Sequence, residues 1–244
     1  MNKEQMSGYP SEEAGQIVMP FYLMCDVSLS MAPDMPRLNE GLQRLRRAIL
    51  AEPLADDVAY IAIAMFSDIA KVVMPLERMS EQQVPTLSPQ SGTNYGCAFR
   101  LLAETIAQDT ADLKARGLKV YRPCVFFLTD GEPLDGDWHQ TFTSTLTYDS
   151  GTKVGMKGHP IFVPFGFRQA PEDVLRKLAY PQGKSKWYHA RNATVEEALN
   201  GMLGIIMQTV VASSRTVSSG QPAVVPLEPP VNSGIAYGDP DDFV

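Results

Sequence analysis

The chain has 244 residues, of which 44% are hydrophobic and 20% are charged, and its formal net charge is −7. This composition is typical of a globular protein with a sizeable core, and the length suits one large domain. The acidic balance argues against a general binder of nucleic acids or anionic membranes, and no apolar run reaches the roughly 18–20 residues that span a bilayer.

The two ends of the chain differ in composition from its middle. Residues 1–16 are polar, lack the apolar core of a signal peptide, and are predicted to be a disordered leader. Residues 216–244 are predicted to be a Pro-rich, acidic tail, in which five prolines from Pro222 onward disfavour regular structure. One domain over residues 17–215 is expected between them.

The chain contains three cysteines, Cys25, Cys97 and Cys124, and no CxxC pair. A disulfide between Cys25 and Cys124 is conceivable if their strands are neighbours. We favour reduced thiols in a cytoplasmic protein, because disulfides are rare in reducing compartments.

Within the central domain, nearly continuous apolar runs alternate with stripes of helical period. The run at 17–26 (IVMPFYLMCD) indicates a strand buried on both faces. Apolar residues that recur every three or four positions between Leu38 and Ile49 indicate an amphipathic helix. In chain order, we expect a strand at 17–26, a helix at 38–49, a strand at 58–66 with a hairpin partner at 69–76, a helix at 94–116, a strand at 122–129, a weaker helix at 138–146, a strand at 160–167, a helix at 172–178, an edge strand at 186–189, and a last helix that opens with the capping box at 194–197.

Strands that alternate with helices predict an α/β fold. We expect an open, doubly wound, mostly parallel sheet with one antiparallel edge strand and helices on both faces. Such sheets bind ligands beyond the carboxyl ends of the strands, where the strand order reverses. Any chemistry is therefore expected at the ends of the first, second and fourth predicted strands.

Oxygen-bearing side chains gather at these strand ends. Asp26, Ser28 and Ser30 alternate along the end of the first strand and so project to one side. Asp130 follows the fourth strand, and Thr93 precedes the long helix. Oxygen ligands suit a hard cation, and two carboxylates balance a divalent charge. The pattern predicts a Mg²⁺ site, with Mn²⁺ as the alternative, whose open position accepts a carboxylate from a protein partner.

Taken one at a time, these side chains could instead be helix caps or turn residues. Thr93, for example, could be the N-cap of the helix at 94–116. The metal hypothesis is favoured because three strand ends of one sheet supply the set together. Asp68 and Asn94 are further candidates, expected to support the ligands from outside.

The order of the five predicted ligands, DxSxS followed by a Thr and then by an Asp in a TDG step, resembles the metal-ion-dependent adhesion site (MIDAS) of von Willebrand factor A (vWA) domains. The resemblance covers roughly residues 18–212 and implies a Rossmann-like vWA fold with an intact MIDAS. The chain departs from the family pattern at Leu29, where the family usually has a glycine between the two serines.

A narrower resemblance is to the TerY-type vWA proteins of bacterial tellurite-resistance systems. It rests on three stretches: SGTNYG at 91–96, VYRPCVFFLTDGEP at 120–133 and IIMQTVVASSRTVSSG at 205–220. What this resemblance implies is a cytoplasmic protein that acts beside a protein kinase and a metal-dependent protein phosphatase in a stress or signalling system.

We therefore predict a non-enzymatic, cation-dependent protein-interaction module. One alternative is a Mg²⁺-dependent hydrolase, such as a phosphatase with Asp26 as the nucleophile. Against it, Ser28 stands where haloacid-dehalogenase-type phosphatases have a second acid, and the chain has no GxxxxGK[ST] loop or GxSxG elbow. The other alternative is a scaffold whose metal site stays empty.

Overall fold

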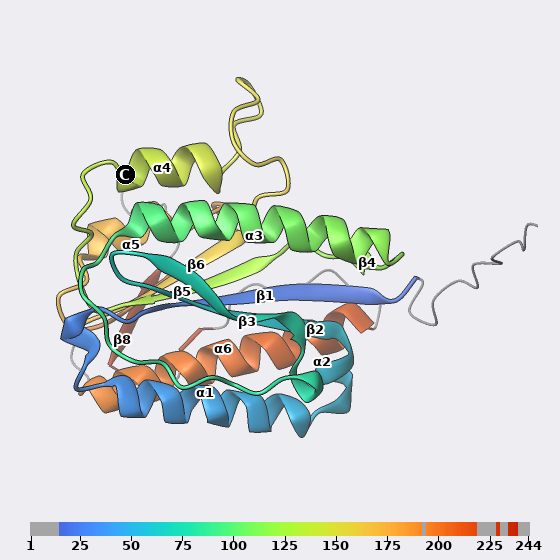
Figure 1. Ribbon diagram of the computed structural model, residues 1–244, viewed down its shortest axis with the longest axis horizontal. Coiled ribbons are helices and arrows are strands. Elements are labelled where there is room, and N and C mark those ends of the chain that lie inside the picture. Colours follow the sequence, from blue (N-terminus) through green and yellow to red (C-terminus); the bar gives the residue numbers. More distant parts are fainter. Residues whose placement is uncertain (1–14, 192–193, 219–227, 230–233, 239–244) are drawn as a thin grey trace, which may run out of the picture.

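In the computed structural model, one twisted sheet runs through the middle of the molecule with helices on either side (Figure 1). The structure describes residues 15–191, 194–218, 228–229 and 234–238. The strands are β1 (Ile17–Asp26), β2 (Ala59–Phe66), β3 (Ala70–Arg78), β4 (Lys119–Val120), β5 (Cys124–Thr129), β6 (Ile161–Phe167), β7 (Trp187–Ala190) and β8 (Ile235–Gly238). The helices are α1 (Met35–Leu50), α2 (Pro53–Val58), α3 (Tyr95–Ala115), α4 (Trp138–Thr145), α5 (Glu172–Leu178) and α6 (Val195–Ser218), with short 3₁₀ turns at Leu29–Met31 and Met79–Glu81.

The strand order is β3-β2-β1-β5-β6-β7-β8, and β4 pairs with the start of β1. The pairs from β2 to β7 are parallel, whereas β3 and β8 are antiparallel to their neighbours. The predicted doubly wound α/β fold is confirmed. The order reverses at β1, because the chain continues first to β2 on one side and later to β5 on the other. This arrangement brings the carboxyl ends of β1 and β5 together at the switch point.

The predicted antiparallel edge strand is β3, and a second antiparallel edge strand, which was not predicted, lies at the far edge of the sheet. There, β7 is covered by β8, with Tyr188 opposite Tyr237. β8 also falls in the tail for which we expected no regular structure. Its four residues contain no proline, so every backbone N–H of β8 is free to pair, whatever the composition around it. The predicted leader up to residue 14 and most of the tail lie outside the described residues.

The register of β1 and β5 also decides the question of a disulfide. Cys25 lies opposite Leu128, whereas Cys124 lies opposite Phe21, four residues away along β1. At about 3.3 Å per residue, the two cysteines are roughly 13 Å apart along the strands, too far for a disulfide. All three cysteines are free thiols, as we expected.

The helices form two layers, one on each face of the sheet. α1, α2 and α6 cover one face, and α3, α4 and α5 cover the other (Figure 1). Among the described residues, no helix has both the length and the apolar character needed to cross a bilayer.

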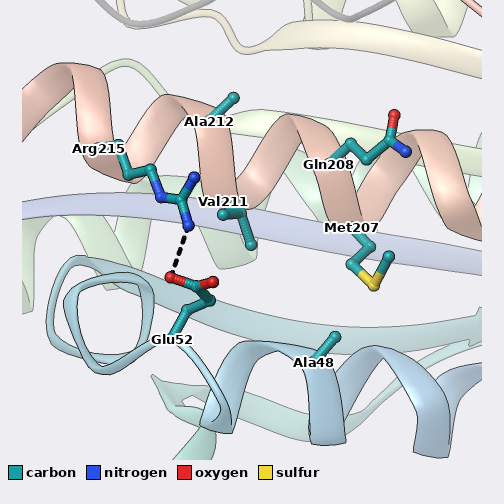
Figure 2. Close-up of a pocket in the computed structure, with 7 residues that line it drawn as sticks. All are labelled: Ala48, Glu52, Met207, Gln208, Val211, Ala212 and Arg215. Atoms are coloured by element: carbon teal, nitrogen blue, oxygen red, sulfur yellow. Dashed lines mark hydrogen bonds and ion pairs between the residues drawn. The ribbon is translucent and has the colours of Figure 1, made fainter.

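α1 and α6 pack side by side and enclose a groove of about 390 Å³ (Figure 2). One ion pair crosses it, in which Nη2 of Arg215 donates to Oε2 of Glu52 at 2.7 Å. The rest of the lining is mostly apolar or small, consisting of Ala48, Met207, Gln208, Val211 and Ala212. This groove therefore offers packing surface and a single salt bridge. The predicted metal ligands lie elsewhere, at the carboxyl ends of the strands.

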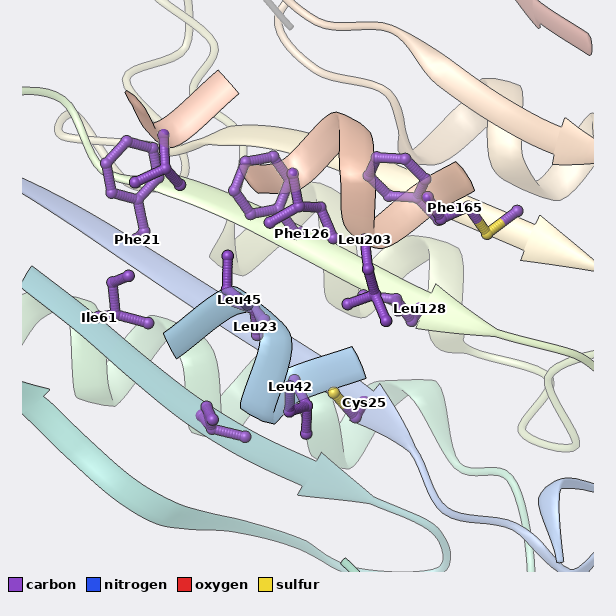
Figure 3. Close-up of a cluster of buried hydrophobic side chains, with 14 of the residues drawn as sticks. Phe21, Leu23, Cys25, Leu42, Leu45, Ile61, Phe126, Leu128, Phe165 and Leu203 are labelled. Carbon is purple, nitrogen blue, oxygen red and sulfur yellow. The ribbon is translucent and has the colours of Figure 1, made fainter. Parts of the chain in front are cut away.

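The core lies between the sheet and the helix layers (Figure 3). Phe21, Leu23 and Cys25 of β1 point toward α1, where Leu42 and Leu45 meet them. The alternate residues of the same strand, such as Tyr22 and Met24, pack on the α3 side. The prediction that β1 is buried on both faces is thus confirmed, and both faces hold its carboxyl end in place.

Candidate functional site

Four of the five predicted ligands form one hydrogen-bonded chain across the ends of β1 and β5. Ser28 Oγ lies 2.9 Å from Ser30 Oγ, and Ser30 Oγ donates to Oδ1 of Asp130 at 2.8 Å. The backbone N–H of Ser28 donates to Oδ1 of Asp26 at 2.8 Å. Residues about a hundred positions apart in sequence thus meet because β1 and β5 are neighbours in the sheet.

The spacing of these oxygens fits a small divalent cation. In an octahedral Mg²⁺ site with bonds of about 2.0–2.1 Å, neighbouring ligand oxygens are about 3 Å apart. The hydroxyls of Ser28 and Ser30 and the carboxylate of Asp130 already have separations of 2.9 and 2.8 Å. Asp26, Ser28 and Asp130 are buried, whereas Ser30 is exposed, so the set has one side open to solvent.

Thr129 and Tyr95 hold the buried end of the set. Thr129 Oγ1 donates to Oδ2 of Asp26 at 2.8 Å and lies 3.0 Å from the hydroxyl of Tyr95. The Tyr95 hydroxyl is also 2.9 Å from the carbonyl oxygen of Gly131, directly after Asp130. Both oxygens of the Asp26 carboxylate therefore accept a hydrogen bond from the protein, which fixes the orientation of this carboxylate.

The two carboxylates lie in a strongly desolvated environment. Burial raises the pKa of Asp26 to about 6, although hydrogen bonds from Ser28 and Thr129 favour the ionised form. Burial also raises the pKa of Asp130, against a hydrogen bond from Ser30 and the nearby charge of Arg168. Two buried carboxylates with raised pKa values at one point are a typical signature of a functional site.

Arg168 is the cation that the structure places next to this set. Its Nη1 donates to the carbonyl oxygen of Ser30 at 2.7 Å and lies 3.4 Å from Oδ2 of Asp130. Its Nη2 pairs with Oδ2 of the buried Asp34. The backbone of Arg168 has φ +54°, which is in the left-handed region that few residues other than glycine adopt. The β6–α5 loop is therefore bent so that this guanidinium joins the carboxyl ends of β1 and β5.

Thr93 lies on the same edge of the sheet but outside the hydrogen-bonded chain. Its carbonyl oxygen accepts a hydrogen bond from the N–H of Leu134 at 2.9 Å, which ties the loop before α3 to the loop after β5. Among the described residues, its hydroxyl has no hydrogen-bond partner, and its side chain is nearly buried. Within the described part of the chain, the structure therefore gives this hydroxyl no hydrogen-bonding role.

The two residues expected to support the ligands have other partners. Asn94, and not Thr93, is the N-cap of α3, where its Oδ1 accepts from the N–H of Cys97 at 2.8 Å. Asp68 accepts from the Ser91 hydroxyl at 3.1 Å and packs over Gly92. Gly92 has φ +79°, and a Cβ there would lie 1.6 Å from Asp68 Oδ1, so only glycine fits. Both residues shape the loop that carries Thr93.

Arg168 and Asp34 were not among the residues predicted from the sequence. Arg168 follows the last residue of β6, so the rule that located Asp130, a polar residue after a buried strand, also applies to it. In the described part of the chain, no three or more His, Cys, Asp or Glu side chains gather as a metal cluster. The candidate set instead combines two carboxylates with hydroxyls.

Comparisons with known proteins find similar folds among solved structures only. No protein-family model and no curated protein match the sequence. Among solved structures, the pilus adhesin SpaC from Lactobacillus rhamnosus GG in its open conformation is 14% identical, and the match covers 81% of this chain and 30% of that one with a TM-score of 0.55. Proximal thread matrix protein 1 from the mussel byssus, with a zinc-occupied MIDAS motif, is 13% identical, with 80% and 48% covered and a TM-score of 0.51.

A von Willebrand factor type A protein from Catenulispora acidiphila is 16% identical, with 81% of this chain and 43% of that one covered and a TM-score of 0.49. The chain spans less than half the length of each of these three solved chains. The sheet order, the two helix layers and the likenesses to SpaC and to proximal thread matrix protein 1 agree with the predicted Rossmann-like vWA fold. The candidate ligands occupy the carboxyl edge of its sheet.

Proposed function

We propose that the chain is a divalent-cation-dependent protein-interaction module. The observation that carries the proposal is the run of oxygens from Ser28 through Ser30 to Asp130, whose separations match those of neighbouring ligands around Mg²⁺. Asp26 and Thr93 complete the proposed set. Mg²⁺, or Mn²⁺ in its place, would supply a Lewis-acidic position on the open side of these residues. An Asp or Glu carboxylate of a protein partner is the ligand that such a position favours.

A hydrolase that uses Asp26 as its nucleophile fits the geometry less well. A nucleophilic carboxylate needs an oxygen that faces the substrate. Asp26 is 0% exposed, and its two oxygens accept hydrogen bonds from Ser28 and Thr129. The buried and doubly hydrogen-bonded carboxylate of Asp26 therefore does not fit a nucleophile, and a non-enzymatic function is part of the proposal.

The narrower resemblance to TerY-type proteins suggests where to look for partners. We propose a cytoplasmic setting, with a protein kinase and a metal-dependent phosphatase as the first candidates. A purified kinase or phosphatase that binds this chain equally well in Mg²⁺ and in EDTA would contradict that assignment of the partner to the site.

The metal site is tested by thermal unfolding of the purified chain in MgCl₂, in MnCl₂ and in EDTA. A ligand at about 100 times its Kd stabilises the folded state by about 2.7 kcal/mol, which is about 5–10 °C in Tm for a domain of this size. We expect Ser30→Ala and Asp130→Asn to lose this increase. Asp173→Ala, at an exposed carboxylate on α5 that pairs with Lys177, is the matched control and should keep it.

Ser30 is a useful position for this test because its side chain is exposed, so its removal leaves the core intact. Equal Tm values in MgCl₂, MnCl₂ and EDTA for the wild-type chain would refute the metal proposal. An undiminished increase in both site variants would refute the assigned ligands.

A further inference from the structure

Three exposed apolar side chains lie on the loops around the candidate site. Among the described residues, six large hydrophobic side chains are exposed. Three of these are Leu29, Ile69 and Leu134, with 64%, 63% and 74% of their surface exposed. They lie in the loops that follow the carboxyl ends of β1, β2 and β5. We call these three side chains the apolar rim.

Backbone hydrogen bonds tie the rim to the proposed ligands. Leu29 stands between the two serines whose hydroxyls lie 2.9 Å apart. The N–H of Leu134 donates to the carbonyl oxygen of Thr93 at 2.9 Å. The carbonyl oxygen of Ile69 accepts from the N–H of Ser67, and the carbonyl oxygen of Ser67 accepts from the N–H of Asn94, next to Thr93. The three apolar side chains are thus built into the loops that carry the site.

Two acidic side chains of these loops make hydrogen bonds within the protein, whereas Glu132 and Asp137 in the loop after β5 are exposed. Asp135 accepts from the N–H groups of Tyr95 and Gly96 at 2.8 and 2.7 Å, and Asp68 accepts from the hydroxyl of Ser91. Arg168, whose side chain is 31% exposed, is the cation in contact with the proposed ligands. A partner therefore meets leucine and isoleucine side chains and the carboxylates of Glu132 and Asp137, together with a centre that holds a guanidinium and the proposed divalent cation.

We infer that the partner of this site is a protein segment in which one acidic side chain is flanked by large apolar side chains. This inference rests on the proposed function, since the cation and Arg168 would take the carboxylate. The apolar rim would select the residues that flank this carboxylate in the partner. The side chains of Leu29, Ile69 and Leu134 cannot form hydrogen bonds, so they select against polar flanks, and their contact with apolar flanks excludes water from the carboxylate–cation bond.

The departure from the family pattern at Leu29 has a physical role in this surface. A glycine at this position would expose backbone, whereas Leu29 places a mostly exposed side chain between two candidate ligands. The rim side chains gain their contact area only when a partner is bound. Burial of parts of these side chains is expected to favour an apolar-flanked segment by about tenfold or more in Kd.

The test is a selection from phage-displayed peptides that have a fixed central Glu and randomised flanking positions. The wild-type chain, immobilised in MgCl₂, is expected to enrich Leu, Ile, Val, Phe and Met at those positions. The triple variant Leu29→Ser, Ile69→Ser, Leu134→Ser is expected to lose this preference. The double variant Leu54→Ser, Val154→Ser, which changes exposed apolar residues away from this edge, is the matched control and should keep it.

The Mg²⁺-dependent increase in Tm of each variant separates the two proposals. An increase in the triple variant equal to that of wild type shows that the fold and the metal site are intact. Where that increase is present, three results would overturn the inference about the rim and leave the metal proposal standing. These are unbiased or polar flanks selected by the wild type, no enrichment at all, and the same apolar enrichment by the triple variant. Absence of the increase in the wild type would overturn the proposed function, and the inference with it.

Discussion

The carboxylate of Asp26 lies at the end of the central strand β1, where it has no contact with solvent. Burial penalises its charged form and raises its pKa to about 6, although Ser28 and Thr129 donate hydrogen bonds that favour the ionised form. A divalent cation bound beside it would reverse this balance, because the ion favours the charged carboxylate. The state of this one group should therefore respond to both pH and metal.

In EDTA, we expect the free energy of unfolding to decrease as the pH rises from about 4 to about 6. The folded state holds a proton on Asp26 at pH values where the unfolded chain, with a pKa of about 3.9, has lost it. A shift of about two pKa units corresponds to roughly 3 kcal/mol. Urea unfolding across this pH range measures the effect, and Asp26→Asn, which cannot titrate, is the control.

The same two proteins should behave differently in MgCl₂. Protons compete with the cation for Asp26, so the stabilisation of wild type by Mg²⁺ should fade as the pH falls through about 6. Asp26→Asn should show no stabilisation by Mg²⁺ at any pH in this range. Identical pH dependence of wild type and Asp26→Asn in EDTA would show that Asp26 does not titrate as the structure indicates.

At the residue scale, most of the candidate ligands were found by one rule, which is that polar residues at the ends of buried strands form sites. Asp26, Ser28, Ser30 and Asp130 follow buried strands, and the structure brings them together. Arg168 was missed because the search was for ligands of a cation, and a positive side chain did not fit that search. Its role depends on the left-handed turn after β6, which no pattern in the sequence indicates.

At the scale of elements, α3 connects the site to the core. Its N-terminus is capped by Asn94, and its first N–H groups donate to Asp135 from the loop after β5. A carboxylate at a helix N-terminus is stabilised by the helix dipole. The start of α3 therefore fixes both Thr93 on one side and the loop with Leu134 on the other.

We expect Asn94→Ala to destabilise the protein by about 1 kcal/mol, since the cap of α3 is lost, and also to weaken Mg²⁺ binding because Thr93 precedes the cap. Thr194→Ala is the matched control. Thr194 caps α6, where its Oγ1 accepts from the N–H of Glu197 at 3.2 Å, and its loss should cost about as much stability without any effect on Mg²⁺. Urea unfolding and Mg²⁺ titration measure the two effects, and equal Mg²⁺ affinity of both variants would contradict the role given to α3.

The elements found from sequence are those that bury many side chains. α1, α3 and the central strands have long apolar patterns, and these predicted their type and approximate bounds. α2, β4 and β8 were missed. Each is short, and each is set mainly by its neighbours: β8 forms because β7 offers an unpaired edge, which is a property of the folded sheet and not of residues 235–238 alone.

At the scale of the whole molecule, the alternation of strands and helices predicted the mostly parallel sheet and its two helix layers. It also placed the candidate ligands Asp26 and Asp130 at the ends of β1 and β5, which are neighbours where the strand order reverses. The pairing partners at the edges were beyond prediction, because they depend on long-range contacts between segments that are far apart in the chain. The centre of a fold is therefore easier to infer from sequence than its borders.

The central position of β1 and β5 has a consequence for the dynamics of the site. Both strands are paired on either side and buried on both faces, so their amides should exchange with deuterium only when the whole molecule opens. The segments at 28–34, 92–94 and 131–137 should exchange much sooner. In a hydrogen–deuterium exchange experiment, Mg²⁺ should slow these three segments and leave the amides of β1 and β5 almost unchanged. Slowing confined to β1 and β5 would mean that the cation acts on global stability alone. The expected result would mean that the ion orders three loops next to two strands that are already rigid before it binds.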